Sequence, residues 1–153
     1  MELLADWREN LVRDDAGISE LLEATRRIAV LGIKTEAQAG QPAIEVPRYM
    51  AEEGYDIVPV PVYYPEVRQI LGRPVYRAVA DIPGDVDLVN VFRRSNDVPP
   101  HVDDIIAARP RFVWFQSGIR NDAAAERLAR AGIKVVQDHC LMVEHARWNR
   151  RRR

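Results

Sequence analysis

The amino-acid sequence predicts an α/β fold in which helices cover both faces of a mainly parallel, doubly wound sheet. Three observations support this prediction. Short, nearly continuous apolar runs recur along the chain, as in strands that are buried on both faces. Segments with helical character lie between these runs, and such alternation is typical of right-handed parallel crossovers. The 153 residues, 47% hydrophobic and 29% charged, suit one globular domain. The expected fold is therefore a single Rossmann-like domain.

Five apolar runs are expected to form the strands of this sheet. Four of them are short and nearly continuous, which fits strands covered on both sides. The third run is less regular, because Asp87 and Asn90 interrupt it. The five runs are residues 28–31, 57–60, 86–92, 112–115 and 133–136.

Four segments before or between these runs are expected to be helices, and three of them carry capping signals. One segment ends at Gly54, which suits the left-handed conformation that follows many helices. Another ends before Arg109-Pro110, because proline disfavours helical geometry at the residue before it. A third begins at Asn121, which suits an N-cap, and ends at Gly132. The four segments are residues 18–27, 44–53, 102–108 and 121–131.

Residues 62–85 fit the alternation of strand and helix less well, because they are rich in proline and glycine. We expect a short helix near 66–71, a short strand near 75–76 and a turn at 82–84.

The expected organisation has three parts. Residues 1–27 are predicted to form a helical extension packed on the domain. Residues 28–147 are predicted to form the Rossmann-like, ligand-binding domain. Residues 148–153, which contain four consecutive arginines, are predicted to be a solvated basic tail.

Charge and composition exclude several functional classes. The formal net charge of −1 gives no general reason to expect binding to nucleic acid or to a membrane. No apolar run approaches the roughly 20 residues of a membrane span, and the first ten residues lack the order of a signal peptide. We therefore expect a cytoplasmic protein. The single cysteine, Cys140, excludes an internal disulfide, and the three scattered histidines lack the spacing of a metal site.

A ligand site is expected at the carboxyl ends of the parallel strands, beside the point where the strand order reverses. The first strand leads into Gly32, Ile33 and Lys34. A glycine permits close approach of the backbone, the start of the next helix offers free amides, and the lysine adds a positive charge; together these features suit a phosphate. The alternative is an ordinary turn, because Gly32 and Gly40 do not form the GxGxxG pattern of dinucleotide enzymes.

The next two strand ends offer an apolar wall and a cation. The second strand ends in Pro61, Val62 and Tyr63, where a Rossmann dehydrogenase usually has an acid for a ribose hydroxyl. These side chains suit the wall of an adenine site, or else a stiff surface connection. The third strand ends in Phe92 and Arg93. The arginine can meet a phosphate through its planar fork of donors, although arginines at strand ends are commonly solvated surface residues.

The fourth strand leads into Gln116, Ser117 and Gly118, a polar pair and a glycine that favour a binding loop over a plain turn. The serine lacks the GxSxG pattern of a nucleophile elbow. No carboxylate can be assigned to orient the adjacent His139 and Cys140. We find no catalytic group in the sequence, and expect that the protein is not an enzyme.

Taken together, these segments resemble the stand-alone CoA-binding protein family, relatives of the N-terminal domain of the succinyl-CoA synthetase α subunit. The likeness covers about residues 26–147, in one order and at compatible spacings. The matching stretches are IAVLGI at 28–33, GYDIVPV at 54–60, VY at 75–76, DIP at 81–83, VDLVNVFR at 86–93, WFQSGI at 114–119 and AGIKVVQDHC at 131–140.

The resemblance implies that coenzyme A or an acyl-CoA binds across the four loops at the carboxyl ends of the strands. A bulky residue at Gly32 is then expected to abolish CoA binding and to leave the fold intact. The positions that would contact the ligand are Gly32, Ile33 and Lys34 for the phosphates, Pro61, Val62, Tyr63, Phe92 and Arg93 for the adenosine, and Gln116, Ser117 and Gly118 for the pyrophosphate or the pantetheine.

The synthetase also needs a phosphorylated histidine from a second domain, which does not fit in this chain. The expected function is therefore CoA binding without catalysis by the protein itself, as in a carrier, a sensor or a CoA-delivering partner. One alternative is an NAD(P)-binding, oxidoreductase-like domain, which the missing ribose acid disfavours. A second is a regulatory module that docks to an acyl-CoA ligase or acyltransferase, with the arginine tail as a contact.

Overall fold

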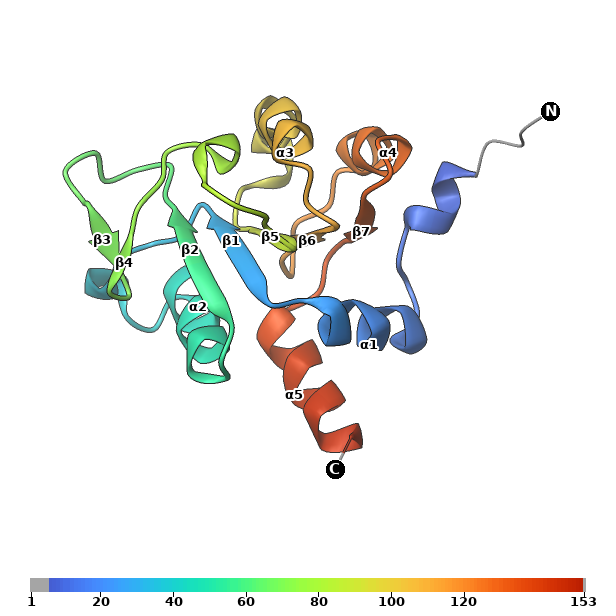
Figure 1. Ribbon diagram of the computed structural model, residues 1–153, viewed down its shortest axis with the longest axis horizontal. Helices are drawn as coiled ribbons and strands as arrows, with labels where there is room; N and C mark the ends of the chain where they lie inside the picture. Colours follow the sequence, from blue (N-terminus) through green and yellow to red (C-terminus); the bar gives the residue numbers. More distant parts are fainter. Residues whose placement is uncertain (1–5, 153) are drawn as a thin grey trace.

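The computed structural model describes residues 6–152, and its main sheet has five parallel strands (Figure 1). The strands are β1 (Arg27–Leu31), β2 (Asp56–Val60), β5 (Leu88–Val91), β6 (Phe112–Phe115) and β7 (Lys134–Val136). They lie in the order β2-β1-β5-β6-β7, and every neighbouring pair is parallel. The predicted doubly wound α/β fold is confirmed.

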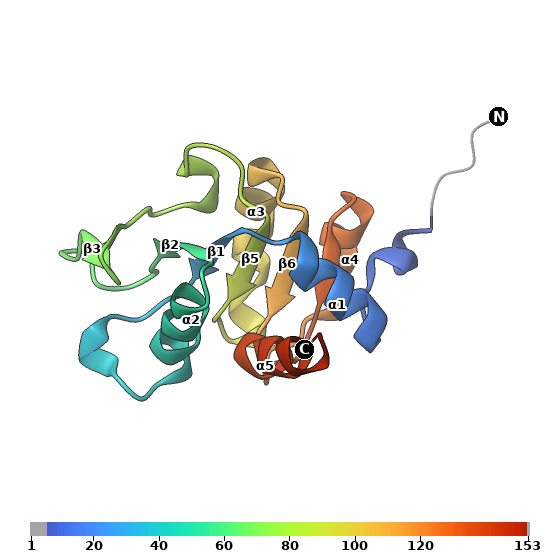
Figure 2. The same cartoon turned by 60° about the horizontal axis from the view of Figure 1, so that its bottom comes forward.

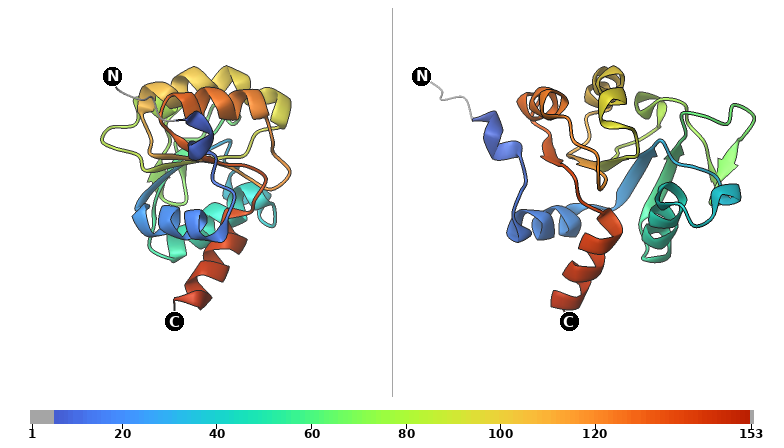
Figure 3. Two further views of the ribbon diagram at one scale, coloured as in Figure 1. Left: turned by 90° about the vertical axis from the view of Figure 1, so that its right-hand side faces the viewer. Right: turned by 180° about the vertical axis from the view of Figure 1, so that it is seen from behind.

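Helices cover both faces of this sheet (Figures 2 and 3). One face carries α3 (Val102–Ala108) and α4 (Asp122–Arg130). The other face carries α1 (Asp15–Ala24), α2 (Pro42–Glu52) and α5 (Leu141–Arg151). The sheet is thus the middle of three layers, and an apolar core lies on each side of it.

Alternate residues of each strand point to opposite faces of the sheet, and both faces are buried. In β1, Ile28 and Val30 pack in the layer of α1, α2 and α5, whereas Ala29 and Leu31 pack in the layer of α3 and α4. A strand covered on both sides has no solvent-facing positions for polar residues. This burial explains why the strands are visible in the sequence as continuous apolar runs.

The order of the strands along the chain reverses between β1 and β5. From β1 the chain passes to β2 on one side, then returns to the other side of β1 and forms β5, β6 and β7 in turn. The helices that follow β1 and β5, α2 and α3, lie on opposite faces of the sheet. The two loops therefore diverge at the carboxyl ends of the strands, where a binding crevice forms in sheets of this type.

The polar residues that interrupt the third apolar run have structural partners. Oδ2 of Asp87 accepts hydrogen bonds from the amides of Arg26 at 3.0 Å and Arg27 at 2.9 Å. Nδ2 of the buried Asn90 donates to Oε1 of Gln116 at 3.2 Å. Each interruption therefore ties β5 to a neighbouring segment.

The prediction of a helix at 66–71 is wrong, because the chain forms an antiparallel hairpin there. The hairpin consists of β3 (Gln69–Ile70) and β4 (Arg73–Pro74). Between them, Leu71 has φ 54° and Gly72 has φ 72°. Positive φ at both central residues is typical of the two-residue type I′ turn that joins adjacent strands.

Several predicted boundaries are displaced along the chain by one to three residues. The first helix ends at Ala24 and not at residue 27, because Arg27 already belongs to β1. This helix begins after Asp14, whose carboxylate accepts a hydrogen bond from the Gly17 amide at 2.8 Å. The strand expected at 75–76 corresponds to β4, two residues earlier.

The described part of the N-terminal extension packs against α4 and the edge strand β7. It begins with a short 3₁₀ helix, Trp7–Asn10. Nδ2 of Asn10 donates to the carbonyl of Ala129 at 2.8 Å, and the amide of Val12 donates to the carbonyl of Val135 at 2.8 Å. Residues 1–5 of the predicted extension lie outside the described residues.

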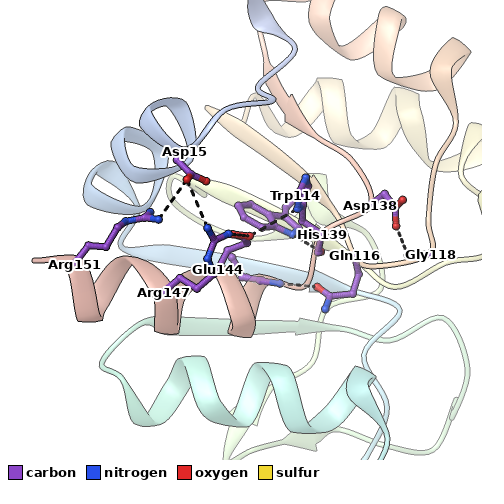
Figure 4. Close-up of polar contacts among 10 residues, drawn as sticks. Asp15, Trp114, Gln116, Gly118, Asp138, His139, Glu144, Arg147 and Arg151 are labelled. Carbon is purple, nitrogen blue, oxygen red and sulfur yellow. Dashed lines mark hydrogen bonds and ion pairs between the residues drawn. The ribbon is translucent and has the colours of Figure 1, made fainter.

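The helix α5 has no counterpart among the sequence predictions. Residues 148–151, predicted to be a solvated tail, form its last turn, and Arg153 lies outside the described residues. Nη2 of Arg147 lies 3.5 Å and Nη1 of Arg151 lies 3.6 Å from Oδ2 of Asp15 in α1 (Figure 4). These pairs are partly exposed, so they orient α5 against α1 more than they stabilise it.

An aromatic cluster joins α5 to α2 within the same layer. Nδ1 of the buried His145 lies 2.9 Å from the hydroxyl of Tyr49, and the two rings meet edge to face. The rings of Tyr55 and Trp148 also contact the imidazole. Burial lowers the pKa of His145 below its ordinary value of 6.5, although the charge of Glu53 opposes this shift.

We expect the free energy of unfolding to fall as the pH drops from 7.5 to 5.5. The unfolded chain takes up a proton on His145 near pH 6.5, whereas the folded chain does so only at lower pH, so acid favours unfolding. Urea denaturation at several pH values measures this dependence. The variant His145→Phe, which cannot titrate, should have a shallower pH dependence; an unchanged slope would contradict the assignment.

Among residues 6–152, no helix combines the length and the apolar character that crossing a membrane requires. In the same part of the chain, no group of three or more His, Cys, Asp and Glu side chains is arranged to hold a metal ion.

Candidate functional site

A cleft of about 370 Å³ lies where the chain leaves β1, β5 and β6. It sits at the carboxyl ends of the strands, beside the reversal of strand order between β1 and β5. The beginning of α2 forms one wall, and the loops after β5 and β6 form the others. Its lining includes Lys34, Ala43, Phe92, Arg93, Ser117 and Gly118.

Gly32 makes the close approach of β1 and β5 possible. It has φ 86°, and its amide donates to the carbonyl of Val60 at 2.8 Å. A Cβ atom at this position would lie 2.3 Å from the carbonyl oxygen of Phe92. The expectation that a bulky residue here leaves the fold intact is therefore wrong, because the added atoms would meet backbone. Gly32 is not part of the cleft lining but lies against Phe92 and Arg93, which are.

The loop after Gly32 is joined to the first turn of α2 by a hydrogen bond that a proline makes available. Pro47 lies inside α2 and has no amide hydrogen, so the carbonyl of Ala43, four residues earlier, has no helical donor. The amide of Lys34 donates to this carbonyl at 3.1 Å. The bond fixes Lys34 beside the beginning of the helix.

The amino-terminal end of α2 faces the cleft. Gln41, Pro42 and Ala43 form this end and belong to the lining. The proline at the first helical position has no amide hydrogen, and the amides of Ile44 and Glu45 donate to the carbonyl of Gln41 at 3.0 and 2.9 Å. The amide of Ala43 has no partner among the described residues and is left at the helix end. Nζ of Lys34 hydrogen-bonds Oε1 of Gln41 across the mouth of the cleft. A helix dipole and an ammonium group thus act at one place, a combination suited to phosphate.

Arg93 crosses from the end of β5 over the glycine turn. Its Cδ lies 3.2 Å from the position that a Cβ of Gly32 would occupy. Nε donates to Nε2 of His101 at 3.3 Å, and Nη1 donates to the hydroxyl of Tyr63 at 3.4 Å. The side chain is only 15% exposed, and Asp97 lies 4.0 Å from it. Arg93 is therefore not a solvated surface residue, the alternative that the sequence left open.

The segment after β2 stands beside the cleft. Pro61 is buried, whereas the exposed fractions of Val62 and Tyr63 are 36% and 63%. None of the three lines the cleft itself, but the Tyr63 ring centroid lies 5.6 Å from the guanidinium of Arg93, which does. Exposed apolar side chains next to a cationic cleft offer a surface on which an adenine can stack.

Arg77 holds this segment, a role that the sequence analysis missed. Its guanidinium donates to the carbonyls of Tyr63 at 3.0 Å, Tyr64 at 2.8 Å and Val67 at 2.8 Å. Tyr64 has φ 61°, so the chain turns sharply at the point that the arginine secures. No local pattern connects residue 77 to residue 63, and only the folded chain reveals the contact.

The loop after β6 is secured by the loop that follows β7. Gly118 has φ 82°, and its amide donates to Oδ1 of Asp138 at 2.7 Å (Figure 4). Ser117 is exposed and lines the cleft.

Besides Pro61, two of the predicted contact residues have buried side chains. Ile33 packs in the apolar core on the α2 side. Gln116 faces the interior, where its Oε1 accepts from Nδ2 of Asn90 at 3.2 Å and from the amide of Leu141 at 3.3 Å. Gln116 therefore joins β5 to the beginning of α5. Period-two alternation explains this position, because Gln116 follows Trp114 on the same face of the strand.

The structure thus brings most of the predicted positions to one edge of the sheet. Those that line the cleft are Lys34, Phe92, Arg93, Ser117 and Gly118; those that adjoin it are Gly32, Pro61, Val62 and Tyr63; those with inward side chains are Ile33 and Gln116.

Comparison with known proteins finds matches in both sequence and structure. A family model described as a CoA binding domain matches residues 26–146. The uncharacterized protein YneT of Bacillus subtilis is 33% identical over 131 residues, which is 86% of this chain and 93% of that protein. The structure of cell-free ID.343 from Thermus thermophilus superposes with a TM-score of 0.80 at 37% identity, over 89% of this chain and 99% of the other.

The fold also occurs as part of a larger enzyme. A dinucleotide-forming acetyl-coenzyme A synthetase of Ca. Korarchaeum cryptofilum superposes with a TM-score of 0.61 at 22% identity. The match covers 76% of this chain and 27% of the synthetase chain. At this identity the likeness concerns the fold alone.

Proposed function

The chain belongs to the CoA binding domain family, and from this premise we propose that its cleft binds coenzyme A or an acyl-CoA without catalysing a reaction by itself. The observation that carries the proposal is the convergence of cations on the beginning of a helix. Lys34, Arg93 and Arg94 line one cleft together with the amino-terminal end of α2. A ligand with several phosphate charges matches this arrangement in sign.

The parts of coenzyme A have distinct partners in this proposal. The pyrophosphate lies at the start of α2 beside Lys34, where the Ala43 amide, the helix dipole and the ammonium group meet it. The adenine stacks near Tyr63, and Arg93 reaches a phosphate from the other side. The pantetheine passes along Ser117, an exposed residue of the lining.

The end of β2 argues against NAD as the ligand. A dinucleotide-binding domain usually has an acid there to hold the ribose hydroxyls. This chain continues from Val60 into Pro61 and Val62, which offer no carboxylate. Coenzyme A and NADP both carry a phosphate on the adenosine ribose, and such a group fits a cationic surrounding better than an acidic one; thermal unfolding with each ligand separates the two.

Thermal unfolding with different nucleotides tests the proposal. Coenzyme A at about 100 times its dissociation constant should stabilise the protein by about 2.7 kcal/mol, raising Tm by about 5–10 °C. NAD and NADP at the same concentration should leave Tm nearly unchanged. A larger shift with NADP than with coenzyme A, or no shift with coenzyme A, would overturn the assignment. Acetyl-CoA incubated with the protein should break down no faster than it does in buffer alone.

A further inference from the structure

We propose that His101 is a positioning residue for the ligand, because it holds the guanidinium of Arg93 in the orientation that meets an anion in the cleft. This inference rests on the proposed function for its consequence, but the contact itself exists without any ligand. His101 does not line the cleft, whereas Arg93 does.

Three separate loops hold Arg93. Its own loop follows β5, and the methylene stem passes over the turn at Gly32. On one side, Nε donates to Nε2 of His101 at 3.3 Å. On the other side, Tyr63 accepts from Nη1 at 3.4 Å and presents its ring to the guanidinium. The side chain is thereby ordered before a ligand arrives, and its remaining N–H groups are left to donate elsewhere.

The contact with His101 requires a neutral imidazole whose Nε2 accepts, so that Nδ1 carries the proton. Burial and the charge of Arg93 both lower the pKa of His101 below its ordinary value of 6.5. The carboxylates of Asp104 and Asp97 act in the opposite direction, but they do not reverse the shift. At neutral pH the imidazole is therefore an acceptor.

Ordering an arginine in advance matters because a free arginine loses much rotamer freedom when a ligand fixes it. A side chain that is already held pays this cost on folding, and the ligand binds more tightly as a result. Loss of the acceptor at His101 should therefore weaken binding through Arg93 and through no other group.

Isothermal titration with coenzyme A at pH 7.5 measures the consequence in four variants. The variant His101→Phe keeps an aromatic ring without an acceptor and should bind about three- to tenfold more weakly, the loss of one hydrogen bond. The variant His101→Gln supplies an amide oxygen as acceptor and should recover most of the affinity. In an Arg93→Met background, adding His101→Phe should change the affinity less than about twofold, since the two sites are coupled.

Nuclear magnetic resonance on the ligand-free protein separates this inference from the proposed function. The Nε–H signal of Arg93, identified by its loss in Arg93→Met, should be visible in the wild type and in His101→Gln. It should be lost to exchange with water in His101→Phe, or in His101→Leu if the phenyl ring prevents folding. If the signal persists without the acceptor, or if His101→Phe weakens binding equally in both Arg93 backgrounds, the inference is wrong. If the signals behave as expected but coenzyme A does not bind to the wild type, the proposed function fails and the positioning of Arg93 stands.

Discussion

Replacing Gly32 by alanine should lower the free energy of unfolding by about 2–6 kcal/mol. Two costs add at this residue. The backbone has φ 86°, a conformation that alanine adopts only under strain, and the new Cβ would lie 2.3 Å from the carbonyl oxygen of Phe92. Because the obstacle is backbone at the end of β5 and not the tip of a flexible side chain, it cannot move without disturbing the sheet.

Gly40→Ala is the matched control for this experiment. Gly40 has φ 95°, and nothing lies within 4 Å of the position of its Cβ. In this variant the free energy of unfolding should fall only by the cost of the backbone conformation, about 1–2 kcal/mol. Urea denaturation of both variants at 25 °C gives the comparison. Equal losses at the two positions would mean that the turn over β5 relaxes freely, and that the close approach is not required.

Replacing Arg93 by methionine should weaken coenzyme A binding about ten- to hundredfold, the usual effect of removing a hydrogen bond to a charged group. Methionine keeps the apolar stem over Gly32 while the guanidinium disappears. The affinity of Arg93→Lys for coenzyme A should lie between those of the wild type and Arg93→Met. Lysine keeps the charge but lacks the fork of donors that His101 and Tyr63 hold. Isothermal titration measures all three proteins.

Arg130→Met removes the same charge at a distance from the cleft. Arg130 lies at the carboxyl end of α4, opposite the carboxyl ends of the strands, and pairs with Glu126 at 2.8 Å. Its loss should change the affinity less than about twofold. A similar loss in both variants would indicate long-range attraction in place of contact, and an unchanged affinity in Arg93→Met would remove this residue from the site.

The central architecture follows from features that a sequence displays locally. Strands buried on both faces appear as unbroken apolar runs, and the helices α3 and α4 end at the residues that their capping signals predict to within one position. The helix α5 lacks such signals. Its first turn follows Cys140, which provides no side-chain cap, and its surface is strongly basic. Its place is determined by partners distant in the chain, Asp15 and Tyr49 among them.

The candidate site could be predicted as a set of loops but not as a set of contacts. Parallel strands bring their carboxyl ends to one edge, so the loops at Gly32, Arg93 and Ser117 were expected to meet. Which side chains face the cleft depends on the pleat of each strand and on long-range hydrogen bonds. Gln116 is turned inward by the first cause, whereas Arg77 secures a loop 10 to 14 residues away by the second.

The proline inside α2 links two events in the folding of this protein. A helix that lacks one internal hydrogen bond would normally leave a carbonyl without a donor. Ala43 is buried, so water cannot readily supply that donor. The missing donor comes from Lys34, outside the helix. The first turn of α2 and the strand-to-helix connection therefore satisfy each other, and neither reaches its final state alone. Any event that displaces the connection, including entry of a ligand at the helix end, therefore breaks the hydrogen bond that the Ala43 carbonyl of α2 accepts.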